Sequence, residues 1–434
     1  MSDINPTRAA GDPTRTIAGD QTRTIAGDPT RAIAWDLLHA VLDLRRSLDD
    51  ALDAQTGYEP RDRAAAHRLA AAVLRRMGSL DAVLEPFLQR APPEGVRHAL
   101  RLGVAGLLLL DTPAHAAVGT AVALVRARRL APFAGLVNAV LRRVAAAGPA
   151  ALEGLDAPRL DTPAWLWTSW GADARAIATA HAAEAPIDLT LRGDPSEDGG
   201  PDPGGEPLPG GGRRLPPGTR VAELPGYAEG AFWVQDQAAS WPARLLAVSP
   251  GEHVADLCAA PGGKTAQLAA AGAHVTAIER DAGRIRRLTE NLTRMALPVD
   301  IVQADALDWS PPEKLDAVLL DAPCTATGTI RRHPDVMRLK RPRDVAELAA
   351  GQARLLAAAA GMLRSGGRLV YAVCSLQPEE GPGQLTSIPP SLRPLPFTAD
   401  ELAALPGART AEGWLRTHPG MGMDGFFAAR FIRR

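Results

Sequence analysis

A regular alternation of short apolar runs and helix-forming runs in the carboxyl-terminal half constrains the fold of this chain most strongly. Apolar runs of strand length fall at residues 254–257, 274–278, 299–303, 317–320, 369–373 and 426–431. Helix-forming runs lie between most of them, notably at residues 281–295 and 343–363. Such alternation predicts an α/β fold, a doubly wound and mostly parallel sheet. Ligands of these sheets bind beyond the carboxyl ends of the strands, so the residues after each strand are the first candidates for a site.

The first of these strands ends at a corner rich in glycine and proline, Asp-Leu-Cys-Ala-Ala-Pro-Gly-Gly-Lys-Thr at 256–265. A strand–turn–helix corner points backbone N–H groups and the positive end of a helix into the crevice at the sheet edge. Gly262 and Gly263 allow a ligand close to the backbone because neither carries a Cβ atom. A loop for ATP or GTP is disfavoured, because Cys258 stands where that loop requires its first glycine. The corner therefore predicts a site for a nucleotide-like cofactor.

Composition limits the class of protein further. A chain of 434 residues, 46% of them hydrophobic, is expected to form two or three domains. Its 48 basic and 49 acidic residues nearly balance, so a nucleic acid must bind through local patches. Three widely spaced cysteines predict neither a disulfide framework nor a zinc site, and they fit a reducing cytoplasm. No apolar stretch has the length of a signal peptide or a membrane span.

The chain divides into four segments. Residues 1–30 consist largely of an eight-residue repeat, which spans 10–33 and is expected to be disordered. Residues 31–150 show helical periodicity and predict an all-α domain, with helical runs following the first helix at 62–77, 80–88, 95–110, 114–130 and 133–147. Residues 151–235 are interpreted as a linker and small region in which strands at 187–192 and 220–224 flank a Gly/Pro loop at 194–218. Residues 236–434 form the α/β domain.

Two acidic residues follow the second and third strands of the α/β domain. Glu279 comes about twenty residues after the corner, where an acid is able to accept both ribose hydroxyls of a nucleoside cofactor. Asp305 follows the next strand and is expected on the adenine side of the same cofactor. The alternative for each is a solvated strand end.

Two cysteines follow the fourth and fifth strands, Cys324 in Asp321-Ala-Pro-Cys and Cys374 in Val-Cys-Ser. Paired thiols at one ligand edge suit transfer of a methyl group to carbon 5 of a pyrimidine. A thiolate that adds to carbon 6 makes carbon 5 nucleophilic toward a sulfonium methyl donor, and a second thiol assists release. Asp321 is the candidate acid near nitrogen 3, and Lys264 would help to lower a cysteine pKa. The residues alone do not rank the two thiols.

A basic run follows Cys324 and contains a single acid, Asp335, between residues 325 and 343. Because the run adjoins a proposed catalytic thiol, we expect it to contact RNA phosphates rather than to form an ordinary solvated surface. The candidate RNA-binding residues are Arg331, Arg332, His333, Arg338 and Lys340.

In combination these motifs resemble those of a known family. The corner, Asp321-Ala-Pro-Cys324, Arg331-Arg-His-Pro-Asp335, Cys374-Ser375 and Glu379-Glu380 are similar to the bacterial RNA (cytosine-5) methyltransferases of the Sun/RsmB type. Gln235-Asp236 and Asp424-Gly-Phe-Phe fit the same pattern. The helical region resembles the amino-terminal domain of that family, which is similar to the antitermination factor NusB. The matching residues are Pro-Ala-His-Ala-Ala-Val at 113–118 and Gly-Leu-Val-Asn-Ala-Val-Leu-Arg at 135–142.

The resemblance implies a fold, a cofactor and a substrate. The fold is a Rossmann-like methyltransferase with a seven-stranded sheet, preceded by a NusB-like RNA-binding domain. The substrate is 16S ribosomal RNA, the protein is a cytoplasmic monomer without membrane association, Cys374 is the nucleophile, and Cys324 assists release. The implied S-adenosylmethionine site consists of Cys258, Ala259, Ala260, Pro261, Gly262, Gly263, Lys264, Glu279, Asp305 and Asp321.

The chain departs from the family pattern at three places. Val373 stands where the family often has threonine, the Gly/Pro loop replaces part of a small RNA-contacting region, and the segment after Glu380 is short enough to lack a helix. Two alternatives remain open, a methyltransferase for transfer RNA and a non-catalytic RNA-binding or assembly factor.

Overall fold

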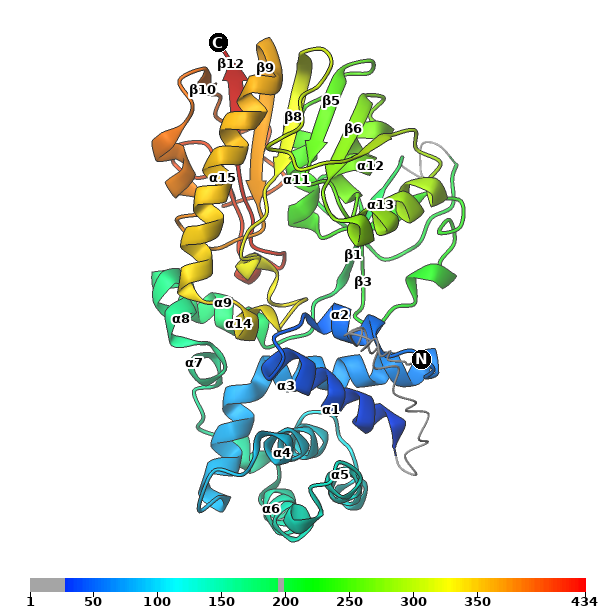
Figure 1. Cartoon of the computed structure of the whole chain (residues 1–434), viewed down its shortest axis with the longest axis vertical. Coiled ribbons are helices and arrows are strands. Elements are labelled where there is room, and N and C mark those ends of the chain that lie inside the picture. Colours follow the sequence, from blue (N-terminus) through cyan, green and yellow to red (C-terminus); the bar gives the residue numbers. More distant parts are fainter. Residues whose placement is uncertain (1–27, 194–198) are drawn as a thin grey trace, which may run out of the picture.

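The computed structural model describes residues 28–193 and 199–434. A helical body and an α/β body are stacked along the long axis (Figure 1). Between them lie a small sheet and the helices α8 (Ala164–Trp170), α9 (Ala174–His181) and α14 (Val336–Leu339). Of the segment 1–30 predicted to be disordered and the Gly/Pro loop predicted at 194–218, residues 1–27 and 194–198 lie outside the described residues. A helix begins at Pro29, and the described part of the loop contains two short strands that were not predicted, at Glu206–Pro207 and Arg213–Leu215. No helix in the described part combines the length and the apolar character that a membrane crossing requires.

The helical body contains six α-helices, in agreement with the predicted all-α character. They are α1 (Pro29–Leu42), α2 (Leu48–Asp53), α3 (Pro60–Leu84), α4 (Glu94–Leu108), α5 (Ala114–Ala127) and α6 (Ala134–Ala147). The separate helices expected at 62–77 and 80–88 are joined in α3, which is kinked at Arg76 (φ −110°, ψ 19°). Asp161 Oδ1 accepts the Ser79 N–H at 2.7 Å, so a side chain enters the helical ladder beside the kink.

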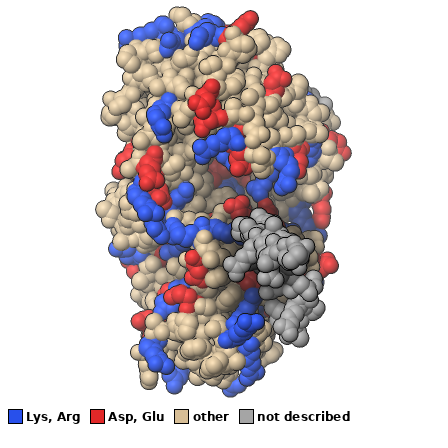
Figure 2. Space-filling model, in the orientation of Figure 1, with Lys and Arg blue, Asp and Glu red and all other residues tan. Residues whose placement is uncertain are grey.

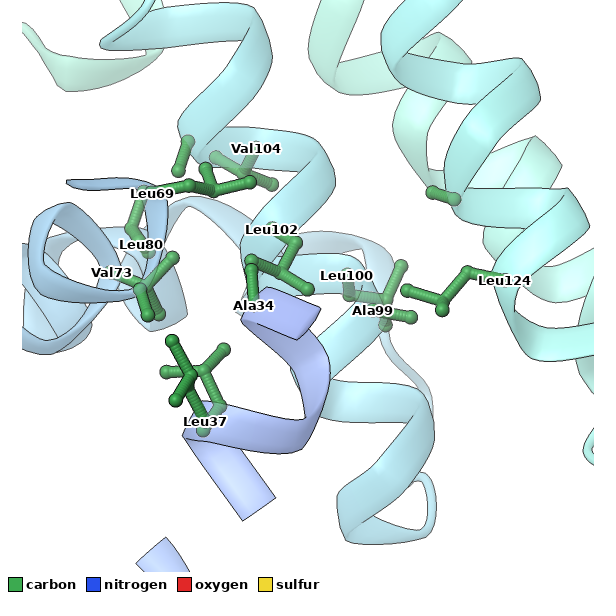
Figure 3. Close-up of a cluster of buried hydrophobic side chains, with 14 of the residues drawn as sticks. Ala34, Leu37, Leu69, Val73, Leu80, Ala99, Leu100, Leu102, Val104 and Leu124 are labelled. Atoms are coloured by element: carbon green, nitrogen blue, oxygen red, sulfur yellow. The ribbon is translucent and has the colours of Figure 1, made fainter. Parts of the chain in front are cut away.

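The core of the helical body is built from the apolar stripes of α1, α3, α4 and α5. Leu37, Val73, Leu80, Leu102 and Leu124 from these four helices converge in Figure 3, and each is at most 5% exposed. Apolar residues at helical spacing therefore form one continuous core, which is the main source of stability for helices of this length.

Three short helices and a small sheet follow. The helices are α7 (Ala157–Asp161), α8 (Ala164–Trp170) and α9 (Ala174–His181), and the sheet has the order β2-β3-β1-β4. Its strands are β1 (Ile187–Leu191), β2 (Glu206–Pro207), β3 (Arg213–Leu215) and β4 (Phe232–Val234). The strand predicted at 187–192 is confirmed as β1, but the one at 220–224 is wrong, because Val221–Glu223 is a 3₁₀ turn. Pro217-Gly218 and Pro225-Gly226 bound this segment and leave too short a run for pairing.

The large sheet has the order β10-β12-β9-β8-β5-β6-β7, with β11 paired beside β12. The five strands from β7 to β9 are parallel, and β12 is antiparallel to β9. This confirms the mostly parallel α/β fold; seven strands form the continuous path and β11 is an eighth. The strands are β5 (His253–Leu257), β6 (His274–Glu279), β7 (Asp300–Gln303), β8 (Leu315–Asp321), β9 (Leu363–Val373), β10 (Leu392–Pro394), β11 (Leu415–Arg416) and β12 (Phe427–Arg433).

Helices cover both faces of this sheet, because alternate strand residues point to opposite sides. Val254 and Leu319 pack toward α11 (Gln237–Leu246) and α12 (Gly263–Ala270). Ala255 and Leu320 pack toward α15 (Pro342–Met362) on the other face. The helix α13 (Ala282–Arg294) packs beside α12 through Leu288.

The chain order reverses between β5 and β8, because β6 and β7 extend the sheet to one side and β8 returns to the other. A crevice at the carboxyl ends of the strands is expected at such a switch point. The corner after β5 and Asp321 at the end of β8 border this position.

Candidate active site

The corner after β5 is a close-packed cradle. Gly262 has φ +102°, which side chains rarely tolerate, and α12 begins at Gly263. A Cβ atom at Gly262 would lie 2.6 Å from Leu288 Cδ1, so that position has no space for a larger residue. Gly262 and Gly263 both line a cavity at this corner.

A cavity beside the corner is lined by Cys258, Glu279, Asp305 and residues of α15. Glu279 is 2% exposed, and its Oε1 accepts backbone N–H groups of Arg280 at 3.0 Å and Asp281 at 3.1 Å. Its Oε2 accepts no hydrogen bond from the described residues, although Arg284 Nη1 lies 3.1 Å away. A buried acid with a free acceptor oxygen fits the hydroxyls of a ribose, and Asp305 lines the same cavity.

A second cavity lies on the other side of the corner. Its lining includes Ala259, Pro261, Gly262, Gly263, Lys264, Asp321, Cys374, His333 and Phe426. The predicted cofactor residues thus divide between two adjoining cavities, and Ala260 lines neither of them. Because Asp321, Lys264 and Cys374 share the second cavity, it is the place where a reacting base fits.

Lys264 and Asp321 form a buried ion pair in this second cavity. Lys264 Nζ lies 2.7 Å from Asp321 Oδ2 and 5.0 Å from the centre of the Phe426 ring. Burial lowers the pKa of Lys264, but the charge and hydrogen bond of Asp321, together with the charges of Cys374 and Asp256, raise it overall. The lysine is therefore a cation, and its compact ammonium group donates to a carboxylate that lines the cavity.

The two strand-end cysteines meet. Cys324 Sγ and Cys374 Sγ are 3.4 Å apart, and both are free thiols. The hydrogen bond to Cys374, followed by burial, raises the pKa of Cys324 well above the ordinary thiol value. Either sulfur is able to donate in the contact between them. Burial raises the pKa of the third cysteine, Cys258, to about 12, so it is not a nucleophile.

Arg331 and Arg332 belong to a buried ion network rather than to an open basic surface. Arg331 is 5% exposed and pairs with Asp236 and with Asp424, the latter at 2.5 Å. Arg332 pairs with the same two carboxylates, and it also lines the second cavity. The Arg331 guanidinium is neutralised within the protein, which differs from the exposed cation expected from the sequence.

The rest of the basic run joins the catalytic domain to the helical body. Asp335 Oδ2 accepts the Leu48 N–H at 2.9 Å, at the start of α2. Arg338, in α14 (Val336–Leu339), donates to the Asp161 carbonyl at 2.9 Å, and Arg75 donates to the Arg331 carbonyl at 3.0 Å. The charge of Arg338 is thus directed inward. The basic run between residues 325 and 343, which the sequence predicts to contact RNA, forms mainly a contact between the two domains.

Cations around this contact remain accessible. His333, Arg341 and Arg343 are exposed and Lys340 is half-buried. Figure 2 shows Lys and Arg side chains gathered in a band across this face, at the level of α14 and the beginning of α15 in Figure 1. These side chains are available to phosphate groups.

Sequence analysis did not identify a role for Glu380, Gln352, Asp236 or Asp424. Glu380 and Gln352 are buried beside the cysteine loops, and the two aspartates hold Arg331 and Arg332. Their contacts join segments far apart in the chain, so the spacing of residues in the sequence does not reveal these roles. Glu380 stood out in the sequence only as part of a family motif.

A crevice at the switch point of a parallel sheet, with two thiols at neighbouring strand ends, fits the class of S-adenosylmethionine-dependent RNA methyltransferases, here joined to a helical domain. Comparisons agree: residues 243–432 match the family model described as 16S rRNA methyltransferase RsmB/F, and residues 28–146 match the NusB family. Ribosomal RNA small subunit methyltransferase B of Xanthomonas campestris is 38% identical over 92% of this chain and 95% of its own length. The corresponding protein of Vibrio cholerae is 36% identical over 90% and 94%.

The chain belongs to the ribosomal RNA small subunit methyltransferase B family. Its activity is therefore S-adenosylmethionine-dependent methylation of ribosomal RNA. Solved structures share the fold. The crystal structure of PH0851 has a TM-score of 0.72 at 22% identity, covering 93% of this chain and 99% of its own. A methyltransferase homologue from Pyrococcus horikoshii has a TM-score of 0.52 at 25% identity, covering 65% and 96%.

Proposed function

We propose that this protein methylates carbon 5 of a cytosine in 16S ribosomal RNA through a covalent bond between Cys374 Sγ and carbon 6. The observation that carries the proposal is the 3.4 Å contact between the Sγ atoms of Cys324 and Cys374, since Cys374 lines a cavity together with Lys264 and Asp321. Carbon 5 of cytosine is a poor nucleophile, and addition of a thiolate at carbon 6 is the step that activates it.

The first half of the reaction uses Cys374 and the ion pair. The Cys374 thiolate bonds to carbon 6, and the π electron pair of the carbon 5–carbon 6 bond shifts to carbon 4–carbon 5. The π pair between carbon 4 and nitrogen 3 moves onto nitrogen 3, which takes up a proton. Asp321 gives a proton to nitrogen 3 as Lys264 passes one to Asp321 along their 2.7 Å hydrogen bond. S-adenosylmethionine supplies, when bound, an electrophilic methyl carbon on a sulfonium. Carbon 5 attacks that carbon, and the sulfur keeps the electron pair of the broken bond.

The second half regenerates the base. The proton on carbon 5 passes to Cys324 as Cys324 gives its own proton to the departing Cys374 sulfur. The carbon 6–sulfur bond breaks, the carbon 5–carbon 6 double bond returns, and nitrogen 3 gives its proton back to the ion pair. Cys374 then releases one proton to water, which is the net proton of the reaction.

The residue assignments follow from the two cavities. Cys258, Glu279 and Asp305 bind the adenosine part of the cofactor, and the backbone from Ala259 to Lys264 holds the end that carries the methyl group. His333, Lys340 and the side chain of Arg332 contact RNA, whereas Arg331 and Arg338 support them from inside.

We infer 16S ribosomal RNA as the substrate, because the matching family is described as a 16S rRNA methyltransferase and the similar proteins are named ribosomal RNA small subunit methyltransferase B. A ribosomal substrate supports a location in the cytoplasm, where we propose that the protein acts as a monomer. The domains that we propose are residues 31–150 for the helical RNA-binding domain, 151–235 for the small linking region and 236–434 for the methyltransferase.

The test is transfer of a tritiated methyl group from S-adenosylmethionine to unmodified 16S RNA, followed by nucleoside analysis. We expect label in 5-methylcytidine and only background label with transfer RNA as the substrate. Label in another nucleoside would overturn the carbon 5 assignment. Preferential labelling of transfer RNA would overturn the choice of RNA.

A further inference from the structure

Glu380 is fully buried, whereas its neighbour Glu379 is exposed. A buried carboxylate is costly unless it is well hydrogen-bonded, so its retention needs a reason. The donors to Glu380 are neutral groups, and they come from three separate segments of the methyltransferase domain.

Four hydrogen bonds converge on this carboxylate. Oε1 accepts the Thr325 N–H at 2.8 Å and Gln352 Nε2 at 3.1 Å. Oε2 accepts the hydroxyls of Thr325 and Ser375, the latter at 2.5 Å. A carboxylate that accepts four donors is in its ionised form, since the protonated acid would itself be a donor at one oxygen. Hydrogen bonds to an anion are about twice as strong as neutral ones.

The donors identify what the carboxylate connects. Thr325 directly follows Cys324, and Ser375 directly follows Cys374. Glu380 therefore ties the loop after β8 to the loop after β9 one residue beyond each thiol. Its own backbone is fixed as well, because Tyr371 Oη donates to the Glu380 carbonyl at 2.5 Å.

We propose that Glu380 is a positioning residue whose carboxylate clamps the two thiol-bearing loops so that Cys324 Sγ and Cys374 Sγ stay in contact. The proposal rests on the two-cysteine chemistry above. It adds a residue that touches neither the base nor the cofactor, and it predicts that the geometry of the thiol pair is lost when the clamp is removed.

The clamp has an electrostatic consequence that a merely structural contact would not have. After the hydrogen bond to Cys374, burial and the charge of Cys374, the charge of Glu380 also raises the pKa of Cys324. The titratable and charged groups around the thiol pair are Tyr371 and Glu380 beside Cys324, Lys264 beside Cys374, and Asp321 beside Lys264. Removing the anion lowers the Cys324 pKa and makes this thiol lose its proton at a lower pH.

The test compares Glu380→Gln with the matched control Glu379→Gln in the full-length protein. Single-turnover methyl transfer to 16S RNA is measured across a pH series, together with S-adenosylmethionine binding and thermal unfolding. For Glu380→Gln we expect a rate loss of about 10–100-fold, with cofactor affinity unchanged. Its rate should also decline at a lower pH than the wild-type rate does. Glu379→Gln should match the wild type.

The outcomes separate the two proposals. A wild-type protein that labels no 5-methylcytidine overturns the proposed function. A wild-type protein that labels it, with Glu380→Gln matching Glu379→Gln in rate and pH profile, overturns the clamp. If Glu380→Gln does not fold, Ser375→Ala serves as the second variant, because it removes one of the four donors to the carboxylate. We expect Ser375→Ala to lower the single-turnover rate, and a rate equal to that of the wild type would contradict the proposal.

Discussion

Cys324 Sγ and Cys374 Sγ lie 3.4 Å apart although 50 positions separate the two residues in the chain. The parallel pairing of β8 with β9 sets Asp321 beside Ala372 and thereby brings the two loops to one point. The pair is asymmetric, because the hydrogen bond between them raises the pKa of Cys324. This direction supports the proposed role of Cys324 as the thiol that assists release.

The ion pair of Lys264 with Asp321 predicts a loss of the chemical step when the lysine charge is removed. Lys264→Met leaves Asp321 without its 2.7 Å donor and so without a source for the proton of nitrogen 3. We expect the single-turnover rate to fall by about 100-fold or more, which is typical of general acid catalysis. Lys314→Met, an exposed control that contacts only a carbonyl of α15, should retain the wild-type rate. A Lys264→Met rate within twofold of wild type would exclude this role.

The corner predicts opposite effects for two glycine substitutions. Gly262→Ala places a Cβ atom 2.6 Å from Leu288 Cδ1 at φ +102°, so we expect about 1–3 kcal/mol of destabilisation and weaker cofactor binding. Gly119→Ala, in the open middle of α5, meets nothing within 4 Å and should stabilise by about 0.5–1 kcal/mol. Urea unfolding measures both. Equal changes in the unfolding free energy of the two variants would contradict the close packing at Gly262.

The buried network around Arg331 predicts a large loss of stability on truncation. Arg331→Ala removes a cation shared by Asp236 and Asp424 and leaves two buried carboxylates with less compensation. The expected cost is about 3–5 kcal/mol. Arg343→Ala, on an exposed arginine, should change the unfolding free energy by less than about 0.5 kcal/mol. If Arg331→Ala weakened RNA binding but left stability unchanged, the arginine would be a phosphate ligand rather than a structural cation.

His181 predicts a specific loss of stability in acid. The ring is 2% exposed and neither nitrogen has a hydrogen-bond partner in the described residues; burial lowers its pKa from 6.5 to about 3. Between these values the unfolded chain binds one more proton than the folded chain, so the stability that the neutral ring allows is lost as the pH falls below about 6.5. From pH 6 to pH 4, wild type should lose about 2 kcal/mol more than His181→Leu. If the unfolding free energies of wild type and His181→Leu changed with pH in the same way, protonation of His181 would not be a cause of acid destabilisation.

Much of the catalytic domain was predictable because its signals are local. Each parallel strand is a short apolar run with a motif at its carboxyl end, so Glu279, Asp305, Asp321, Cys324 and Cys374 could be placed at one edge from order alone. The cysteine pair is the clearest case, since strand ends that share an edge bring distant thiols together.

Other features depend on contacts that no local pattern records. Arg331 looks like an RNA ligand in the sequence, but Asp236 and Asp424 reach it from segments about one hundred positions away on either side. The kink in α3 depends on Asp161, a residue of a later helix. The clamp at Glu380 likewise appears only when the loops after β8 and β9 are seen together.

The measurement that tests the central claim most directly is capture of the covalent RNA adduct by the two cysteine variants. Each variant is incubated with S-adenosylmethionine and unmodified 16S RNA and resolved on a denaturing gel. We predict that Cys324→Ala accumulates a protein–RNA adduct, because attack proceeds and release fails, and that Cys374→Ala forms none. The reverse pattern would exchange the two roles. Absence of adduct from both variants, with methylation by the wild type intact, would contradict covalent catalysis.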